Sequence, residues 1–187
     1  MSERFNTVMK EYGALLSRVA TTYEANEAIR QELYQEICMA CWQALPRFNE
    51  DASLKTYLLK IAHNRCISHV AKEANRIKSS DISDTTENRS HDPDPAEASR
   101  TASHLSVENQ IIQSQKLSSL LTAVRELNIT NRQIITLSME GCGNKEIAEI
   151  TGLTANNVGV SISRIKSELK NKMTSIESRV NARSVKK

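Results

Sequence analysis

One segment of the chain, Ser79–Ser106, limits the fold more than any other feature of the sequence. It reads SSDISDTTENRSHDPDPAEASRTASHLS, and its only large aliphatic residues are Ile82 and Leu105. Such a composition cannot bury enough apolar surface to offset the entropy that is lost on ordering. We therefore predict a flexible linker that divides the chain into two folded parts. Fully extended, this linker could span up to about 90 Å.

The sequence on either side of the linker predicts an all-α protein made of two small helical domains. Five Gly and three Pro among 187 residues are too few for the closely spaced turns of an all-β chain. Apolar residues recur at helical spacing in both parts. The predicted organisation is an N-terminal domain over 1–78, a flexible acidic linker over 79–113, a C-terminal domain over 114–172 and a basic tail over 173–187.

Charge is distributed unevenly along the chain, although the formal net charge is only +3. Residues 1–78 carry 11 Lys and Arg against 9 Asp and Glu, and residues 117–187 carry 11 against 6. Residues 79–116 carry 3 against 7. This pattern indicates two modules that attract anions, joined by a segment that avoids them. Random variation in a protein of nearly neutral charge is the alternative.

The N-terminus and the hydropathy of the chain predict a soluble cytoplasmic protein. The first residues, MSERFNTVMKEY, do not resemble a signal peptide. No apolar run approaches the roughly 18 residues that a membrane-spanning helix needs.

Two cysteines, Cys38 and Cys41, form a CxxC pair inside the stretch EICMACWQAL. That stretch has helical periodicity and no turn residue, and no second pair supplies further ligands at the spacing of a zinc site. We therefore expect buried structural cysteines, no metal site and no cofactor. A redox or metal sensor built on this pair remains the alternative. The chain has no P-loop, HExxH or GxSxG motif, so we expect no catalytic residues and no enzyme.

Three amphipathic helices are predicted in the N-terminal domain, over Val8–Ala20, Glu27–Leu45 and Leu54–Arg76. Pro46 ends the second helix because proline cannot continue the hydrogen-bond ladder. Ser53 or Asp51 can cap the third. The inward stripe of the third helix is predicted to be Leu54, Leu58, Ile61, Ala62, Cys66 and Val70. A second side offers hydrogen-bond donors and positive charge: Thr56, Lys60, His63, Asn64 and Ile67.

Four helices are predicted in the C-terminal domain, over Leu117–Glu126, Arg132–Glu140, Lys145–Thr151 and Ala155–Asn171. The last two have helix-turn-helix form. Gly152 allows the left-handed turn between them, and Thr154 caps the second.

The outward side of that last helix carries residues suited to the DNA major groove. Asn157, Ser161 and Arg164 recur at spacings of four and three, and Asn and Arg can pair bidentately with bases. A helical hairpin used only for packing is the structural alternative. The candidate residues for duplex DNA are Thr154, Ala155, Asn156, Asn157, Ser161, Arg164 and Lys166.

The stretch ELYQEICMACWQALPRFNEDASLKTYLLKIAHNRCISHV resembles the main domain of bacterial sigma factors of the extracytoplasmic-function group. The matching residues are Glu32-Leu33, Gln35-Glu36, Trp42, Phe48, Ser53, Thr56, Leu58, Ile61-Ala62 and Asn64. Tyr57 stands where the family usually has Trp, Ala40 where it often has Arg, and Ser68 where it often has an acidic residue. The C-terminal helix-turn-helix is similar to the second domain of the same group, with Gly159, Ser161 and Ser163 at positions that are often basic.

The resemblance implies a function. It implies a subunit that directs core RNA polymerase to specific promoters and assists DNA melting, with an anti-sigma factor as a further partner. In the family, the helix that bears Glu32, Gln35 and Glu36 binds the polymerase. The helix-turn-helix reads the minus-thirty-five element as duplex DNA. The residues that would read the minus-ten element as a single strand are Phe48, Ser53, Lys55, Thr56, Lys60, His63 and Asn64.

The chemistry of these residues suits that task. An extruded base needs a polar group at its edge and nearby cations for its backbone. Asn64 can donate and accept, so we expect it to read a base, whereas Lys55 and Lys60 are expected to contact phosphates. A stand-alone helix-turn-helix regulator that acts without polymerase is the alternative function.

Overall fold

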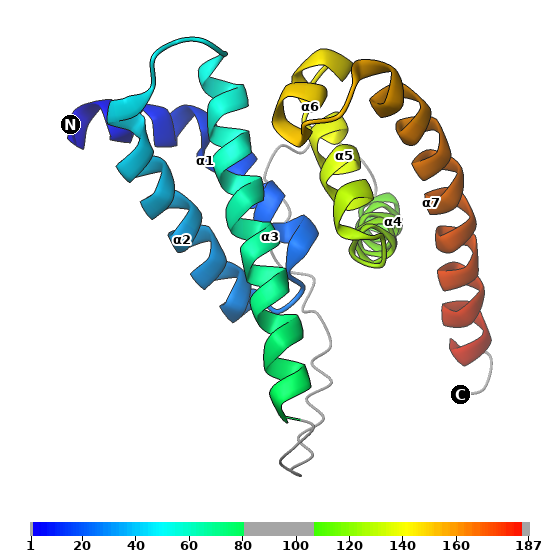
Figure 1. Cartoon of the computed structure of the whole chain (residues 1–187). Coiled ribbons are helices and arrows are strands. Elements are labelled where there is room, and N and C mark those ends of the chain that lie inside the picture. The colour runs from blue at the N-terminus through cyan, green and yellow to red at the C-terminus, as the bar shows by residue number, and fades with distance from the viewer. Residues whose placement is uncertain (1, 81–106, 185–187) are drawn as a thin grey trace.

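The computed structural model describes residues 2–80 and 107–184, and the side chains of 3–76 and 112–175. All elements in these ranges are helical, as predicted (Figure 1). They are α1 (Ser2–Tyr23), α2 (Glu27–Ala44), the 3-10 helix η1 (Leu45–Arg47), α3 (Leu54–Ser80), α4 (Val107–Arg125), α5 (Ile129–Met139), α6 (Asn144–Thr151) and α7 (Ala155–Ser184). Most of the predicted linker, residues 81–106, and the last residues of the tail, 185–187, lie outside the described residues.

Local chemistry sets the helix ends in the N-terminal domain. The Asn26 side chain accepts a hydrogen bond from the amide of Ile29 at 3.2 Å and so caps α2. Pro46 lies in η1, which turns the chain away from the α2 axis. Ser53 Oγ accepts a hydrogen bond from the amide of Thr56 at 3.1 Å. Of the two predicted caps, Ser53 is therefore the one that caps α3.

The C-terminal domain contains the predicted helix-turn-helix in α6 and α7. Gly152 has φ +74°, the left-handed conformation that the turn requires. Thr154 Oγ1 accepts from the amide of Asn157 at 3.3 Å and caps α7, as predicted.

Two helices of this domain, α4 and α5, start at least three residues earlier than the sequence predicted. Asn128 caps α5 by accepting from the amide of Asn131 at 2.9 Å, so this helix begins at Ile129. The sequence had indicated Asn128 and Thr130 as helix breakers, so the predicted start of this helix was Arg132. Helix α4 begins at Val107, inside the range 79–113 that was assigned to the linker.

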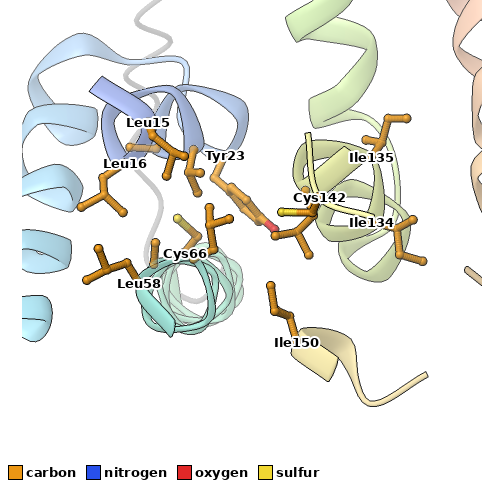
Figure 2. Packing of buried hydrophobic residues seen from close by; sticks show 14 of the residues in the cluster. Leu15, Leu16, Tyr23, Leu58, Cys66, Ile134, Ile135, Cys142 and Ile150 are labelled. Atoms are coloured by element: carbon orange, nitrogen blue, oxygen red, sulfur yellow. The ribbon is translucent and has the colours of Figure 1, made fainter. Parts of the chain in front are cut away.

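The two domains pack directly against each other. Helix α1 contacts α4 and α5, and α3 contacts α5 and α6. The buried residues form one hydrophobic cluster that runs from Leu16 and Leu58 in the N-terminal domain to Ile134 and Ile147 in the C-terminal domain. Figure 2 shows the middle of this cluster, where Tyr23 extends from α1 into the space between the domains. Among the helices of the described residues, no stretch combines the length and the hydropathy of a membrane span.

Candidate nucleic-acid interface

An open groove of about 670 Å³ lies between the end of α2, η1 and the middle of α3. Asn64 lines it, and Arg47 and Arg65 supply positive charge. Trp42 adds an aromatic ring that is 44% exposed. The groove therefore combines an amide, two cations and a stacking surface, which are the groups that hold an unpaired nucleotide. The lining residues are Ala40, Trp42, Gln43, Ala44, Pro46, Arg47, Ile61, Asn64, Arg65 and Ser68.

The loop between η1 and α3 is held beside this groove by two aromatic rings. The centroids of Phe48 and Tyr57 lie 5.1 Å apart, and Tyr57 Oη donates to the carbonyl oxygen of Ala44 at 3.0 Å. Glu50 adopts a left-handed conformation with φ 65° at the tip of the loop. These contacts tie the loop to both α2 and α3.

The structure divides the predicted single-strand residues of α3 between two surfaces. Lys60 and Asn64 are exposed, as a surface that contacts DNA requires. Lys55 and Thr56 instead face the C-terminal domain. Lys55 Nζ donates to the carbonyl oxygen of Glu140 at 2.6 Å, and Thr56 Oγ1 donates to Glu146 Oε1 at 3.3 Å.

His63 lies in the core, with none of its surface exposed. Its Nδ1 is 2.9 Å from Tyr23 Oη, and its Nε2 is buried without a hydrogen-bond partner. Burial lowers the pKa of His63 to about 3, so the ring is neutral at physiological pH. In this arrangement, His63 cannot touch a DNA strand.

The N-terminal half of α7 presents the predicted duplex-reading residues. Asn156, Asn157 and Arg164 are exposed, while Ala155 and Ser161 are half-buried. Lys166 is exposed on a different side of the helix, where it borders an apolar groove of about 440 Å³. This second groove is lined by Leu120, Ile135, Met139, Lys166, Leu169, Lys170, Met173 and Thr174.

The predicted polymerase-binding residues lie on the exposed side of α2. Glu32, Gln35 and Glu36 are all exposed. Met39 and Trp42 continue this side, with 57% and 44% of their surfaces exposed. Figure 1 shows α2 on the side of the molecule away from the C-terminal helices.

Four residues of these two surfaces were not among the site residues predicted from the sequence: Met39, Trp42, Arg47 and Arg65. Met39 could have been found, because it falls outside the buried stripe of α2 that contains Leu33, Ile37 and Cys41. No pattern in the sequence indicates that Trp42, Arg47 and Arg65 line one groove. They come from different elements, which only the packing of α2 on α3 brings together.

The cysteines lie in apolar surroundings. Cys41 and Cys66 are buried, and burial raises the pKa of each thiol to about 12. Burial also raises the pKa of Cys38, which is half-buried. Within the described part of the chain, no three His, Cys, Asp or Glu side chains gather as a metal ion would require.

Comparisons with known proteins identify both domains. Residues 8–76 match the family model of sigma-70 region 2, and residues 117–169 match that of sigma-70 region 4. The chain is 22% identical over 174 residues to the RNA polymerase sigma factor NccH of Alcaligenes xylosoxydans xylosoxydans, a match that covers 88% of this chain and 84% of NccH.

Solved structures show the same fold. The sigma factor RpoE of Bartonella quintana, solved with the anti-sigma factor NepR, superposes with a TM-score of 0.68 at 19% identity and covers 92% of this chain and 98% of RpoE. CnrH, solved with the cytosolic domain of CnrY, gives a TM-score of 0.60 at 16% identity over 94% of this chain and 90% of CnrH. The two matched regions, in this order and within this fold, show that the chain belongs to the sigma-70 family as a sigma factor of the extracytoplasmic-function group.

Proposed function

We propose that this sigma factor divides the promoter between two surfaces. The groove beside α3 holds the unpaired strand of the minus-ten element, and the N-terminal half of α7 lies in the major groove of the minus-thirty-five element. The observation that carries this proposal is the position of Asn64 in one open groove with Trp42, Arg47 and Arg65. An extruded base would find there a ring to stack on and an amide at its edge.

Each predicted minus-ten residue has a role that its surroundings support. Asn64 would read a base, and exposed Lys60 would bind a phosphate. Phe48 and Ser53 would shape the loop, through the ring of Tyr57 and the cap of α3. Lys55 and Thr56 would reach DNA once the C-terminal domain moves away, and buried His63 would hold α3 in place.

The exposed side of α2 would bind core polymerase. Glu32, Gln35 and Glu36 supply polar contacts there. Exposed Met39 supplies apolar area on the same side of α2. An exposed Met at such a site is typical of a protein-binding surface.

In α7, we propose that Asn156, Asn157 and Arg164 contact the edges of bases or phosphates, with Ser161 beside them. Thr154 and Ala155 lie at the N-terminus of the helix, where backbone amides attract phosphate. Lys166 would contribute only through its charge, because it lies beside the apolar groove.

The partners follow from this function. The protein would act in the cytoplasm, as a non-catalytic subunit of polymerase. RpoE was solved with the anti-sigma factor NepR, and CnrH with the cytosolic domain of CnrY. We propose that this chain also has an anti-sigma partner. The apolar groove formed by α4, α5 and α7 could receive side chains of such a partner.

Transcription with purified core polymerase on a library of promoters with randomised elements tests the proposal. Wild-type protein should select one minus-ten and one minus-thirty-five sequence. Asn64→Ala should lose the preference at one minus-ten position, worth about 1–3 kcal/mol, and keep the minus-thirty-five preference. Asn6→Ala, an exposed Asn on α1, is the matched control and should leave both preferences unchanged.

The same library separates this function from a stand-alone regulator. A sigma factor should bind its selected promoter tightly only with core polymerase, whereas a regulator would shift the duplex alone. If Asn64→Ala selected the same minus-ten sequence as the wild type, the proposed role of the groove would be wrong.

A further inference from the structure

Val160 is a large apolar residue in the N-terminal half of α7, and 45% of its surface is exposed. At 3.6 residues per turn, it lies about 160° around the helix from Val158, which is fully buried in the core of the domain. Among the described residues, neither the apolar cluster nor the groove between α4, α5 and α7 includes it. Packing within the C-terminal domain therefore does not explain the apolar side chain at this position.

Valine is also an unfavourable residue for the exposed side of a helix. Its β-branched side chain loses rotational freedom against the preceding turn, so its helix propensity is lower than that of Ala, Lys or Arg. Single apolar residues are common on protein surfaces, so exposure alone does not indicate a function. The neighbours of Val160 on the helix surface do.

Val160 lies at the centre of the side of α7 that is proposed to read duplex DNA. Asn156 precedes it by about one turn, and Arg164 follows it by about one turn. Asn157, three residues before Val160, flanks it as well. All three of these polar residues are exposed. A base pair that they contact would therefore also face Val160.

The residues next to Val160 along the chain have short side chains. Gly159 has no Cβ atom, and Ser161 and Ser163 carry only a hydroxymethyl group. A helix surface without long side chains lets the backbone approach a ligand closely. Val160 has a short branched side chain, so it can reach a base edge only if the helix approaches in this way.

The thymine methyl group is the apolar group by which a base pair is recognised in the major groove. The other groups that distinguish the base pairs there are hydrogen-bond donors and acceptors, which a valine side chain cannot pair with. Asn156 and Asn157 can bind the edge of adenine, whose partner base is thymine. This side of α7 thus offers an amide for adenine and, one turn away, an apolar side chain for a thymine.

We propose that Val160 is a specificity-determining residue, which recognises the methyl group of one thymine in the minus-thirty-five element. This inference rests on the proposed function of α7 and adds a base contact that is not a hydrogen bond. From Asn156 to Val160 the helix rises by about 6 Å, close to the length of two base pairs of B-form DNA. The thymine should therefore lie within about two base pairs of the position whose preference Asn156→Ala loses in the promoter library.

Deoxyuridine tests the methyl contact directly, because it lacks the methyl group of thymidine and keeps every hydrogen-bonding group. The full-length protein with core polymerase first selects its minus-thirty-five sequence from the promoter library. Deoxyuridine then replaces each thymidine of that element in turn, on either strand. Competition binding gives the affinity ratio between each thymidine promoter and its deoxyuridine counterpart. For the wild type, this ratio should be about fourfold at one thymidine, as expected for the burial of one methyl group.

Val160→Ala removes the methyl groups that would contact thymine, and it should fold because alanine favours the helix. At the sensitive thymidine, this variant should bind the thymidine and deoxyuridine promoters equally well. Its preferences at the other positions of the element should equal those of the wild type. Ile112→Ala is the matched control, because Ile112 is another apolar residue, 42% exposed, on α4. This control should keep the fourfold ratio.

Three results would overturn this role of Val160. The selected element could contain no thymine on either strand, or the wild type could bind every deoxyuridine promoter as tightly as its thymidine counterpart. Val160→Ala could also keep the fourfold ratio. Each of these results could occur in a protein that still selects a minus-thirty-five sequence through α7. If the wild type selects no sequence at this element, the proposed function of α7 is itself wrong, and the role of Val160 fails with it.

Discussion

The phenol oxygen of Tyr23 lies 2.9 Å from Nδ1 of His63, inside the core and next to the C-terminal domain. The guanidinium carbon of Arg132, on α5, lies 5.4 Å from the centre of the Tyr23 ring. Tyr23 therefore links α1 to a histidine of α3 and to an arginine of the other domain. Tyr23 also interacts electrostatically with the Cys66 thiol and with the Arg132 guanidinium group.

Acid should destabilise the folded protein through His63. Burial lowers the folded-state pKa of this residue to about 3, against an ordinary value of 6.5. Between these values the unfolded state binds a proton that the folded state does not. The stabilisation is thus complete above pH 6.5 and is lost as the pH falls toward 3, by about 1.4 kcal/mol per pH unit.

Urea unfolding at pH 7.5 and pH 5.5 measures this effect. The loss of unfolding free energy between the two pH values should be about 1.4 kcal/mol smaller in His63→Gln than in the wild type. His69→Gln, which removes the histidine that pairs with Glu24, is the control for a second histidine of α3. An equal loss in wild type and His63→Gln would contradict the prediction.

The buried thiols should be nearly inert in the folded protein. Burial raises the pKa of Cys41 and Cys66 to about 12, so at pH 8 the fraction of each as thiolate is about a thousandfold below that of an ordinary thiol. Titration with Ellman's reagent should show these two thiols only after urea is added. Rapid formation of a Cys38–Cys41 disulfide with dilute peroxide, together with a change in transcription, would instead support the sensor alternative.

Gly152→Ala should destabilise the C-terminal domain by about 1 kcal/mol, because an L residue is disfavoured at φ +74°. A Cβ atom there would meet nothing within 4 Å, so the cost comes from the backbone conformation alone. Gly143→Ala is the matched control, since Gly143 has an ordinary φ of −73°. Thermal unfolding compares the two variants, and equal midpoints would show that the turn does not need glycine.

Arg164→Ala and Lys166→Ala should differ in their effect on the minus-thirty-five preference. Arg164 is exposed beside Asn157, whereas Lys166 borders the groove formed with α4 and α5. Arg164→Ala should weaken selection at one base position by about 1–3 kcal/mol, while Lys166→Ala should leave the selected sequence unchanged. Selection from the promoter library measures both, and a changed sequence with Lys166→Ala would place that residue at the DNA.

Helix positions and caps could be predicted because they depend on neighbours in the chain. Ser53, Thr154 and Gly152 act at the helix ends where their residue types predicted. The start of α5 was placed too late, because Asn128 can either break a helix or cap one. Only the backbone geometry of the turn distinguishes these two roles.

The two faces of α3 show the limit of such patterns. Helical spacing placed Thr56 and His63 with Lys60 and Asn64 on a polar side, and two of these four residues are buried in the structure. The partners of the buried pair are Glu146 and Tyr23, which lie 90 and 40 positions away in the chain. No local pattern contains such partners.

The helices, most of their caps, the family and the two kinds of DNA-reading module can be predicted from the chain alone, because they follow from residue types at short, regular spacings. The shared core of the two modules, and the contacts of Lys55 and Thr56 with the C-terminal domain, emerge only when the helices pack. These contacts depend on which apolar helix faces pack together and on where that packing places the charged groups. Arg18 and Glu140 are 122 positions apart, and folding alone brings them within 2.6 Å.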